Sequence, residues 1–424
     1  MQRYQSYKPS GIQWVEKIPS HWGAERAKWL FNRMERPVRP EDDVVTAFRD
    51  GQVTLRTNRR TEGFTNAIQE HGYQGIRKGD LVIHAMDAFA GAIGVSDSDG
   101  KSTPVYAACI PRGEYPVNSY YYAYLLRYMA HSGYIESLSK GIRERSTDFR
   151  FAEFRELPLP IPDKDEQDRI VAFLDQKTDE IDSAIAMKER LIELLQEQVS
   201  ILINNAVTKG LNADVSQRDS GVVWIGQIPS HWYVKRAKFI FQEIDERSVN
   251  GEEELLSVSH MTGVTPRSEK TNVYMFMAED YSGSKLCRPN DLVFNIMWAW
   301  MGALGVSDQV GIVSPSYGVY RQLKEGTFNN WYLEHLLRSK LYVAEYNKRS
   351  TGLHSSRLRL YSHMFFDMEL GFPPREEQDE IERETKKQVS QADAVITSVR
   401  SEIEKLAELR SSLVASVVTG KIRV

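Results

Sequence analysis

Two segments of the chain carry apolar residues at the spacing of a coiled-coil helix. In the first segment, seam positions recur at steps of three and four residues from Leu174 to Ala206. The second segment repeats the same steps from Thr385 to Val417, 211 residues later. Each stripe runs over about five heptads, so each predicts one long helix with a single apolar seam. Pro162 before the first stripe and Gly210 after it are typical boundaries of such a helix.

These two helices are expected to pack against each other. A helix of about 40 residues spans roughly 60 Å, and its apolar seam must be covered by a partner. The second helix offers a matching seam. We predict an antiparallel pair, because that arrangement closes a tandem repeat around a pseudo-twofold axis. The alternative is that each helix folds back on its own globular domain. The regular stripes and their charged flanks favour the pair.

The whole chain consists of two tandem copies of one repeated unit. Residues 10–31 read SGIQWVEKIPSHWGAERAKWLF, and residues 220–241 read SGVVWIGQIPSHWYVKRAKFIF. Further along, the segments DLV, GVSD, LLR and EQD recur at an offset of 211 residues, the last at Glu166–Asp168 and Glu377–Asp379. A period of about 210 residues is too long for a solenoid repeat and indicates a tandem domain duplication.

Each copy starts with about 150 residues that mix short β-rich runs with turn signals. These runs are DLVIHAM and VYAACIP in the first copy, and DLVFNIM and GIVSPSYGVYR in the second. An aromatic-rich helix is expected near 118–130, and again near 329–346. The predicted fold class is therefore α+β, with two tandem globular domains and two long helices. We place the four parts at residues 1–160 (first globular domain), 161–211 (first helix), 212–372 (second globular domain) and 373–424 (second helix).

The distribution of charge separates the long helices from the rest of the chain. The net charge of the chain is −4, which taken alone argues against a nucleic-acid binder. Residues 163–197 carry a net charge of −6 and residues 375–410 carry −3, so the remaining residues carry +5. The acidic charge is thus concentrated on the helices, and the globular domains are basic on balance.

The cysteines and the N-terminus bear on the compartment. Cys109 and Cys287 are the two cysteines of the chain, and their separation forms neither a disulfide framework nor a zinc site. The polar N-terminus has no secretory signal, and no apolar run approaches the roughly 20 residues of a membrane span. We expect a cytoplasmic protein with no bound metal.

The two copies agree unevenly. The opening motif, the DLV strand and the helix seam are shared, whereas residues 42–75 and 252–286 barely agree. Shared parts suggest a common scaffold, and divergent loops suggest two different ligands of one kind. The divergent loops are rich in side chains that bind bases and phosphates. The nominated DNA contacts are Arg56, Asn58, Arg59, Arg60, Lys140, Arg143, Arg145 and Arg150 in the first copy, and His260, Thr262, Arg267, Lys348, Arg349, His354, Ser355, Arg357 and Arg359 in the second.

No pattern of residues predicts a catalytic site. His21 and His231 of the IPSHW segments have no nucleophile or carboxylate pair at a suggestive spacing. Trp14, Trp22, Trp224 and Trp232 are interpreted as anchors of the N-terminal arm. The segment 94–102 has one residue too many for a phosphate-binding P-loop, and no methyltransferase, metalloprotease or nucleophile-elbow motif occurs.

Trp298 and Trp300 are two positions apart on a strand or its exit loop, so their side chains are expected to point the same way. We interpret them as core residues, with contact to DNA as the alternative.

Taken together, these motifs resemble the specificity subunit of type I restriction-modification enzymes over essentially the full chain. The motifs that carry this resemblance are the S-G-x-x-W and I-P-S-H-W openings, the D-L-V and G-V-S-D strand regions, and the segment P-x-P-x-x-x-E-Q-D at the start of the first long helix. The first copy departs at His84–Phe89, where the second copy has Asn295–Trp300.

The resemblance implies that each globular domain is a target recognition domain that reads one half of a bipartite, asymmetric DNA site. It also implies that the helices set the gap between the halves and dock two modification subunits, which restriction subunits then join. S-adenosylmethionine, ATP and Mg²⁺ are expected on those partner subunits, and none on this chain, which is expected to have no catalytic activity.

Two other classes of protein stay open at this stage. A coiled-coil adaptor that binds only proteins explains the helices but not the divergent basic loops. A self-sufficient nuclease or methyltransferase predicts turnover by the chain alone, and the missing motifs argue against it.

Overall fold

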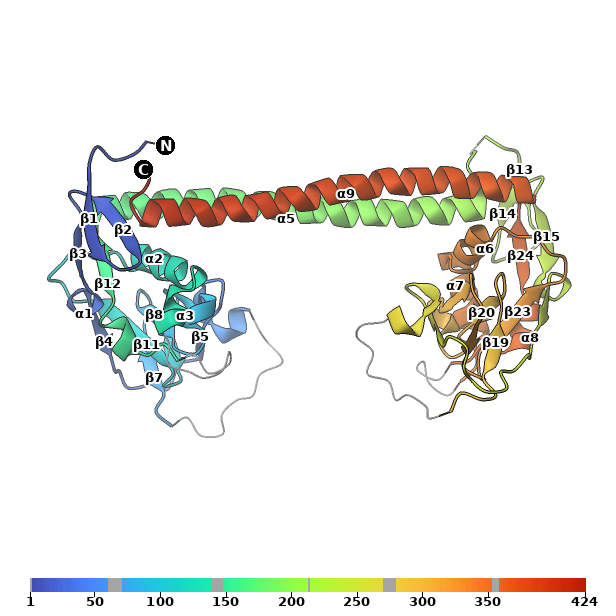
Figure 1. Ribbon diagram of the computed structural model, residues 1–424, viewed down its shortest axis with the longest axis horizontal. Coiled ribbons are helices and arrows are strands. Elements are labelled where there is room, and N and C mark those ends of the chain that lie inside the picture. Colours follow the sequence, from blue (N-terminus) through green and yellow to red (C-terminus); the bar gives the residue numbers. More distant parts are fainter. Residues whose placement is uncertain (1, 60–70, 139–147, 213, 270–279, 353–357) are drawn as a thin grey trace. The chain divides into compact units, whose positions relative to one another are not determined.

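The computed structural model describes residues 2–59, 71–138, 148–212, 214–269, 280–352 and 358–424. The chain divides into two compact units, each described here by itself. Unit 1 comprises Met1–Glu189 and Arg400–Val424, and unit 2 comprises Arg190–Val399. Each unit therefore contains one globular domain together with parts of both long helices (Figure 1).

The described elements of unit 1 are short strands and helices followed by one long helix. In chain order they are β1 (Tyr7–Ile12), β2 (Val15–Pro19), β3 (Gly23–Arg26), α1 (Ala27–Leu30), β4 (Phe31–Met34), β5 (Val45–Ala47), β6 (Val53–Leu55), the 3₁₀ turn η1 (Arg56–Asn58), β7 (Gln74–Ile76), β8 (Leu81–His84), η2 (Ala88–Ala90), β9 (Ile93–Val95), β10 (Gly100–Ser102), β11 (Tyr106–Pro111), α2 (Ser119–His131), α3 (Tyr134–Leu138), α4 (Phe151–Phe154), β12 (Pro158–Ile161) and the start of α5 (Lys164–Lys209).

Unit 2 repeats this order of elements. They are β13 (Gln217–Asp219), β14 (Gln227–Pro229), β15 (Tyr233–Arg236), η3 (Ala237–Phe239), β16 (Phe241–Glu243), β17 (Leu256–Ser259), β18 (Gly263–Pro266), η4 (Arg267–Glu269), β19 (Lys285–Cys287), β20 (Leu292–Phe294), η5 (Ala299–Met301), β21 (Leu304–Val306), β22 (Gly311–Val313), β23 (Gly318–Gln322), α6 (Asn330–Leu337), α7 (Lys340–Arg349), α8 (Ser362–Phe366), β24 (Glu369–Phe372) and the start of α9 (Arg375–Val418).

Both units have the same sheet topology, which confirms the predicted α+β class and the duplication. The central antiparallel sheet has the order β4-β11-β8-β9 in unit 1 and β16-β23-β20-β21 in unit 2. Smaller pairs also correspond, among them β5-β6 with β17-β18 and β7-β10 with β19-β22. The expected β-rich runs become β8, β11, β20 and, for GIVSPSYGVYR, the two strands β22 and β23.

The DLV strands are apolar throughout because both of their faces are covered. Leu81 and Ile83 of β8 belong to the core that includes α2, whereas Val82 packs into a second cluster with the β5–β6 hairpin. Leu292 and Val293 of β20 divide in the same way between the two clusters of unit 2. Alternate residues of a strand point to opposite faces, so a sheet covered on both sides needs an unbroken apolar run.

The aromatic-rich helix differs between the copies. In unit 1 it is the single helix α2, as predicted. In unit 2 the predicted helix over 329–346 is instead two helices, α6 and α7, with Arg338 and Ser339 between them. Here the backbone N–H of Lys340 donates to the side chain of Asn204 on α5 at 3.2 Å rather than continuing the helical ladder.

The two long helices run antiparallel within each unit. In unit 1, Asp182 of α5 pairs with Arg410 of α9, and Lys188 pairs with Glu402, so rising numbers on one helix meet falling numbers on the other. Every predicted seam position from Leu174 to Ala206 and from Thr385 to Val417 is buried or partly buried. Among the described residues, none of the helices combines the length and the apolar character that crossing a membrane requires.

Candidate nucleic-acid interface

The repeated motifs form a joint between each globular domain and a long helix. In unit 1, the carboxylate of Glu166, in the first turn of α5, accepts hydrogen bonds from Trp22 Nε1 at 2.9 Å and from the Tyr4 hydroxyl at 2.7 Å. His21 Nε2 lies 2.9 Å from the same carboxylate. Burial and the neighbouring Glu166 raise the pKa of Tyr4 above its ordinary value. His21 is thereby assigned to the joint.

The next two residues of the EQD segment fix the domain to the helix. The Gln167 side chain accepts from the backbone N–H of Asn118 and donates to the carbonyls of Pro116 and Pro162, at 2.7 to 2.9 Å. Asp168 accepts from the Asn118 amide at 2.6 Å. Asn118 is also the N-cap of α2, so the three residues orient α2 against the start of α5.

Unit 2 reproduces this joint with the corresponding residues. Glu377 accepts from Trp232 Nε1 at 3.1 Å and lies 2.6 Å from His231 Nε2. Gln378 accepts from the backbone N–H of Asn329, and Asp379 accepts from its side chain. Trp22 and Trp232 are buried, as the interpretation as anchors requires, whereas Trp14 and Trp224 are partly buried.

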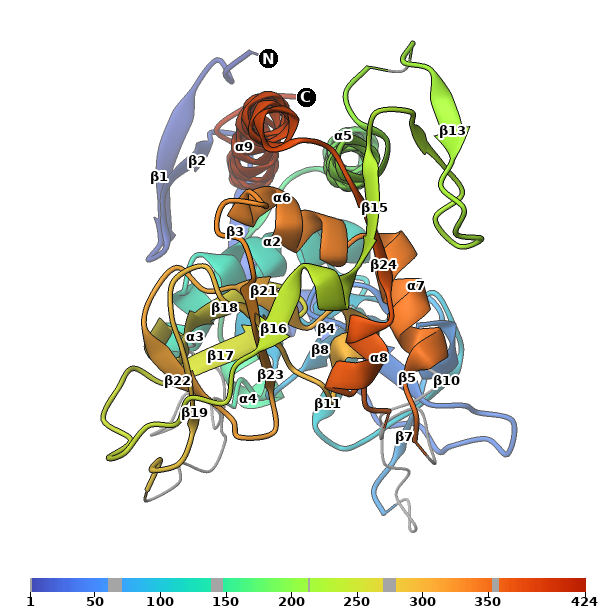
Figure 2. The same ribbon diagram turned by 90° about the vertical axis from the view of Figure 1, so that its right-hand side faces the viewer.

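Each unit also holds the end of the other copy's helix. In unit 1 the buried Tyr121 hydroxyl donates to the Val418 carbonyl at the end of α9, and in unit 2 Tyr332 donates to Val207 near the end of α5. Gly420, with a φ of +72°, follows α9 and packs closely on Pro19, because a Cβ at this position would lie 2.5 Å from that proline. The β1–β2 hairpin of unit 1 continues this contact, since Tyr7 donates to the Lys421 carbonyl, and the β13–β14 hairpin lies beside the end of α5 in unit 2 (Figure 2).

The nominated DNA contacts are only partly described. Those that lie outside the described residues are Arg60, Lys140, Arg143, Arg145, His354, Ser355 and Arg357.

In unit 1 the described candidates are held by local partners. Arg56 and Asn58 form η1, and the Asn58 amide donates to Thr54 at 2.8 Å. Arg59 donates to Asp50 at 2.6 Å, and its guanidinium lies 4.4 Å from the centre of the Phe48 ring. Arg150 is exposed and pairs with Asp148. The structure thus brings Arg56, Asn58 and Arg59 together on one turn.

In unit 2 the candidates fall into two groups. His260 and Thr262 lie in the exposed β17–β18 connection, and Arg267 begins η4 after it. Lys348 and Arg349 end α7, where Arg349 pairs with the buried Glu345 at 2.6 Å. Arg359 belongs to the same group as Lys348 and Arg349, because its backbone pairs with that of Thr351, just beyond α7.

The turn after the DLV strand carries residues that the nomination left out. In unit 1, Asp87 precedes η2 and accepts from exposed Arg49 at 2.8 Å, while its backbone N–H donates to His84 Nδ1 at 3.0 Å. Burial lowers the pKa of His84. In unit 2, Trp298 occupies the place of Asp87. The prediction that Trp298 belongs to the core is wrong, because its side chain is 48% exposed, although Trp300 is partly buried.

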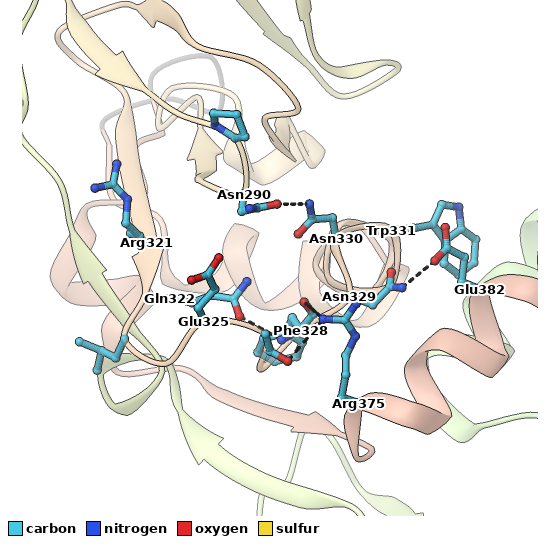
Figure 3. A pocket seen from close by; sticks show the side chains of 13 residues that line it. Asn290, Arg321, Gln322, Glu325, Phe328, Asn329, Asn330, Trp331, Arg375 and Glu382 are labelled. Carbon is cyan, nitrogen blue, oxygen red and sulfur yellow. Dashed lines mark hydrogen bonds between the residues drawn. The ribbon is translucent and has the colours of Figure 1, made fainter.

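A pocket of about 590 Å³ lies near the start of α9 in unit 2 (Figure 3). Its polar side chains largely bind one another: Asn330 donates to Asn290, and Asn329 donates to Glu382, both at 2.6 Å. Arg375 donates to the Phe328 carbonyl at 3.1 Å. The bonds of Glu382 and Arg375 belong to the joint between α6 and α9, that of Asn330 ties α6 to the turn before β20, and we assign the pocket no ligand.

Comparison with solved structures identifies the fold. No sequence model of a protein family matches the chain. One similar chain comes from a structure of the assembly and conformational transition of a type I restriction-modification system. It has a TM-score of 0.63 at 16% identity, with 96% of this chain and 99% of that chain covered. The HsdS subunit from Thermoanaerobacter tengcongensis has a TM-score of 0.53 at 15% identity, with 96% and 98% covered.

The chain has the fold of a type I specificity subunit. The full coverage of both chains means that the specificity-subunit fold accounts for both globular domains and both long helices, not for one domain alone. At 15 to 16% identity the likeness concerns the arrangement of the backbone, so the side chains at the surface must be interpreted from this chain itself.

Proposed function

We propose that this chain is the DNA sequence-reading subunit of a type I restriction-modification enzyme. Each globular domain would read one half of a bipartite, asymmetric site, and the long helices would set the gap between the halves. The observation that carries the proposal is the unequal divergence of two copies with one fold. The joint residues repeat almost one for one, whereas the exposed basic turns differ.

The chemistry of those turns suits duplex DNA. Arg, Asn, Thr and His side chains bind phosphates and the polar edges of bases in the major groove. Arg56, Asn58 and Arg59 share one turn in unit 1, and Lys348, Arg349 and Arg359 share one region of unit 2. The partners of Arg59 and Arg349 are single carboxylates, and a phosphate could compete with such pairs.

The long helices suit protein partners better than DNA. Their net charges of −6 and −3 over residues 163–197 and 375–410 repel phosphate. We propose that they dock two modification subunits, to which restriction subunits are added. S-adenosylmethionine, ATP and Mg²⁺ would be held by those partners, and this chain would contribute recognition without catalysis.

The decisive experiment maps adenine methylation in cells that produce this chain with the modification subunit of its system. We expect a new bipartite motif with a fixed gap that disappears when this chain is deleted. If the assembled complex binds DNA but produces no new methylation, the chain serves a different enzyme as an adaptor.

Single substitutions test the assignment of one domain to one half-site. Arg349→Ala or Arg357→Ala should weaken recognition of one half of the mapped motif. Binding of the unsubstituted complex to DNA should itself weaken steeply as the salt concentration rises, because salt competes with the contacts to phosphates. Equal loss at both halves would contradict the assignment.

A further inference from the structure

The turns η2 and η5 have the same backbone and different surfaces. In unit 1 the N–H groups of Asp87, Ala90 and Gly91 donate to the carbonyls of His84, Asp87 and Ala88. In unit 2 the corresponding bonds run from Trp298, Met301 and Gly302 to Asn295, Trp298 and Ala299. Both turns end on a glycine with positive φ, +91° and +81°. The two copies therefore keep the turn and change what it presents.

Each turn is also tied to the chain that returns from a nominated basic loop. The N–H of Phe149 donates to the Ala85 carbonyl at 3.0 Å, and the N–H of Leu360 donates to the Ile296 carbonyl at the same distance. In unit 2, Arg359 precedes this bond and pairs with Thr351 just beyond α7. The turn that carries Trp298 is thus hydrogen-bonded to the segment that carries the basic residue Arg359.

Trp298 is held with its indole toward solvent. The indole of Trp300 lies nearly parallel to it, at 19° and a centroid distance of 5.9 Å, and Trp300 Nε1 donates to the Met297 carbonyl at 3.0 Å. A Cβ on Gly302, which ends the turn, would lie 3.1 Å from Val343 of α7, so η5 packs closely on α7 while Trp298 stays exposed.

The corresponding surface in unit 1 is ionic. Asp87 is held by Arg49 at 2.8 Å, and the residue that corresponds to Arg49 in the second copy is His260. One position thus presents a paired carboxylate and guanidinium in one domain and a large aromatic ring in the other. Charged side chains such as Arg49 and Asp87 can hydrogen-bond to the polar edges of bases, whereas an aromatic ring such as that of Trp298 makes apolar contacts with bases.

We propose that Trp298 is a base-contacting residue of unit 2, whose exposed indole makes an apolar contact with a nucleobase. The contacted group is either the C5-methyl group of a thymine or the face of an unstacked base. Lys348, Arg349 and Arg359 hold phosphates around it. In unit 1 the Arg49–Asp87 pair reads its half-site by hydrogen bonds instead. The inference rests on the proposed function and adds that the two half-sites are read with different chemistry.

The test uses the full chain co-purified with its modification subunits on duplexes that contain the mapped motif. Trp298→Ala is compared with Trp298→Phe and with Tyr233→Ala. Tyr233 is 49% exposed, close to the 48% of Trp298, and lies on β15, which pairs with β24 in a sheet separate from the central one. Binding is measured by fluorescence anisotropy on the intact motif and on motifs with either half scrambled.

We expect Trp298→Ala to weaken binding to the intact motif about tenfold, as loss of an aromatic–base contact does. It should also abolish discrimination at one half-site while leaving the other unchanged. Trp298→Phe should recover part of both effects, and Tyr233→Ala should match the unsubstituted chain. Replacing each thymine of that half-site by uracil identifies a methyl contact, if the loss is seen only with Trp298 present. A change in 2-aminopurine fluorescence that depends on Trp298 identifies an unstacked base.

Three outcomes would overturn the inference. Trp298→Ala could bind with unchanged affinity and discrimination. It could fail to co-purify with the modification subunits, which would make Trp298 a protein contact. It could weaken binding with no response to uracil or 2-aminopurine, which would indicate a contact to the sugar-phosphate backbone. If the unsubstituted complex binds no bipartite motif at all, the proposed function fails instead.

Discussion

At the residue scale, the glutamate of the EQD segment does more than complement a helix dipole. Glu166 gathers Trp22, Tyr4 and His21, and Glu377 gathers Trp232 and His231. The two joints are not equivalent, because the Glu166 side chain is 7% exposed and the Glu377 side chain 27%. A carboxylate that accepts several bonds in a buried site leaves its donors unpaired when it is removed.

Glu166→Ala should therefore destabilise unit 1 by about 2–4 kcal/mol, because it leaves the buried Trp22 donor and the partly buried Tyr4 donor without a partner. Glu377→Ala should cost unit 2 less, since water reaches that joint. Urea denaturation followed by tryptophan fluorescence measures both. Glu197→Ala, an exposed position on α5, is the matched control and should change stability by no more than about 0.5 kcal/mol. Equal costs for all three variants would refute the role given to Glu166.

The two thiols are expected to be unreactive in the native protein. Cys109 and Cys287 are both free and buried, and burial raises the pKa of Cys287 to about 11 and that of Cys109 further above its ordinary value. A raised pKa leaves little thiolate near pH 8, and the thiolate is the reactive form. Ellman's reagent at pH 8 should label neither cysteine quickly in buffer and both in denaturant. Rapid labelling of one thiol in buffer would show that its strand opens.

Residue roles could be predicted only where the pattern was local. The anchoring tryptophans followed from the repeated IPSHW segments, but the role of Glu166 did not, because its donors lie more than 140 positions away in the sequence. Trp298 was misassigned for a related reason. Whether a turn residue faces inward depends on what packs behind the turn, here Val343 of α7, and no spacing rule near Trp298 contains that information.

At the element scale, the long helices could be predicted closely. The predicted segments 161–211 and 373–424 contain α5 and α9, and the seam follows the predicted three-four steps. A period summed over five heptads averages out local noise. The break between α6 and α7 was not predicted, because the bond from Lys340 to Asn204 on α5 competes with the helical ladder and is a tertiary contact.

Neighbouring positions on α9 provide a matched test of the seam. Ile396 is 5% exposed and Val395 is 47% exposed, so only the first lies in the seam. Ile396→Ala should destabilise the helix pair by about 2–4 kcal/mol through lost burial and a cavity, whereas Val395→Ala should cost less than about 0.5 kcal/mol. Thermal unfolding followed by circular dichroism at 222 nm compares them. The seam assignment fails if the Val395 variant is the less stable one.

At the scale of the whole molecule, neither copy completes its own unit. The core of unit 1 includes Leu413, Val417 and Val418 of α9, which come from the second copy. Unit 2 likewise includes Ala206 and Val207 of α5 in its core. Each globular domain thus holds the start of its own helix and the end of the other copy's helix. The duplication could be found from the sequence alone, but this exchange could not, because both helices have equivalent seams.

The exchange predicts the behaviour of half of the chain. A fragment of residues 1–211 lacks Arg400–Val424, but its own second half of α5 carries the corresponding seam. Leu202 and Val207 stand for Leu413 and Val418, and the Val207 carbonyl can accept the bond that Tyr121 makes to Val418. Arg410 is replaced by Val199, so the pair with Asp182 is lost, at a cost of about 0.5 kcal/mol for such an exposed pair.

Two fragments should therefore associate through antiparallel helices into a twofold-symmetric homodimer in which each supplies the missing helix end of the other. Analytical ultracentrifugation should give twice the mass of the fragment, and unfolding should depend on concentration. Leu202→Asp places a charge in the exchanged seam and should abolish the dimer, whereas Ile201→Asp, at an exposed neighbour, should leave it intact. A monomeric fragment with cooperative, concentration-independent unfolding would mean that each globular domain is complete without the borrowed helix end.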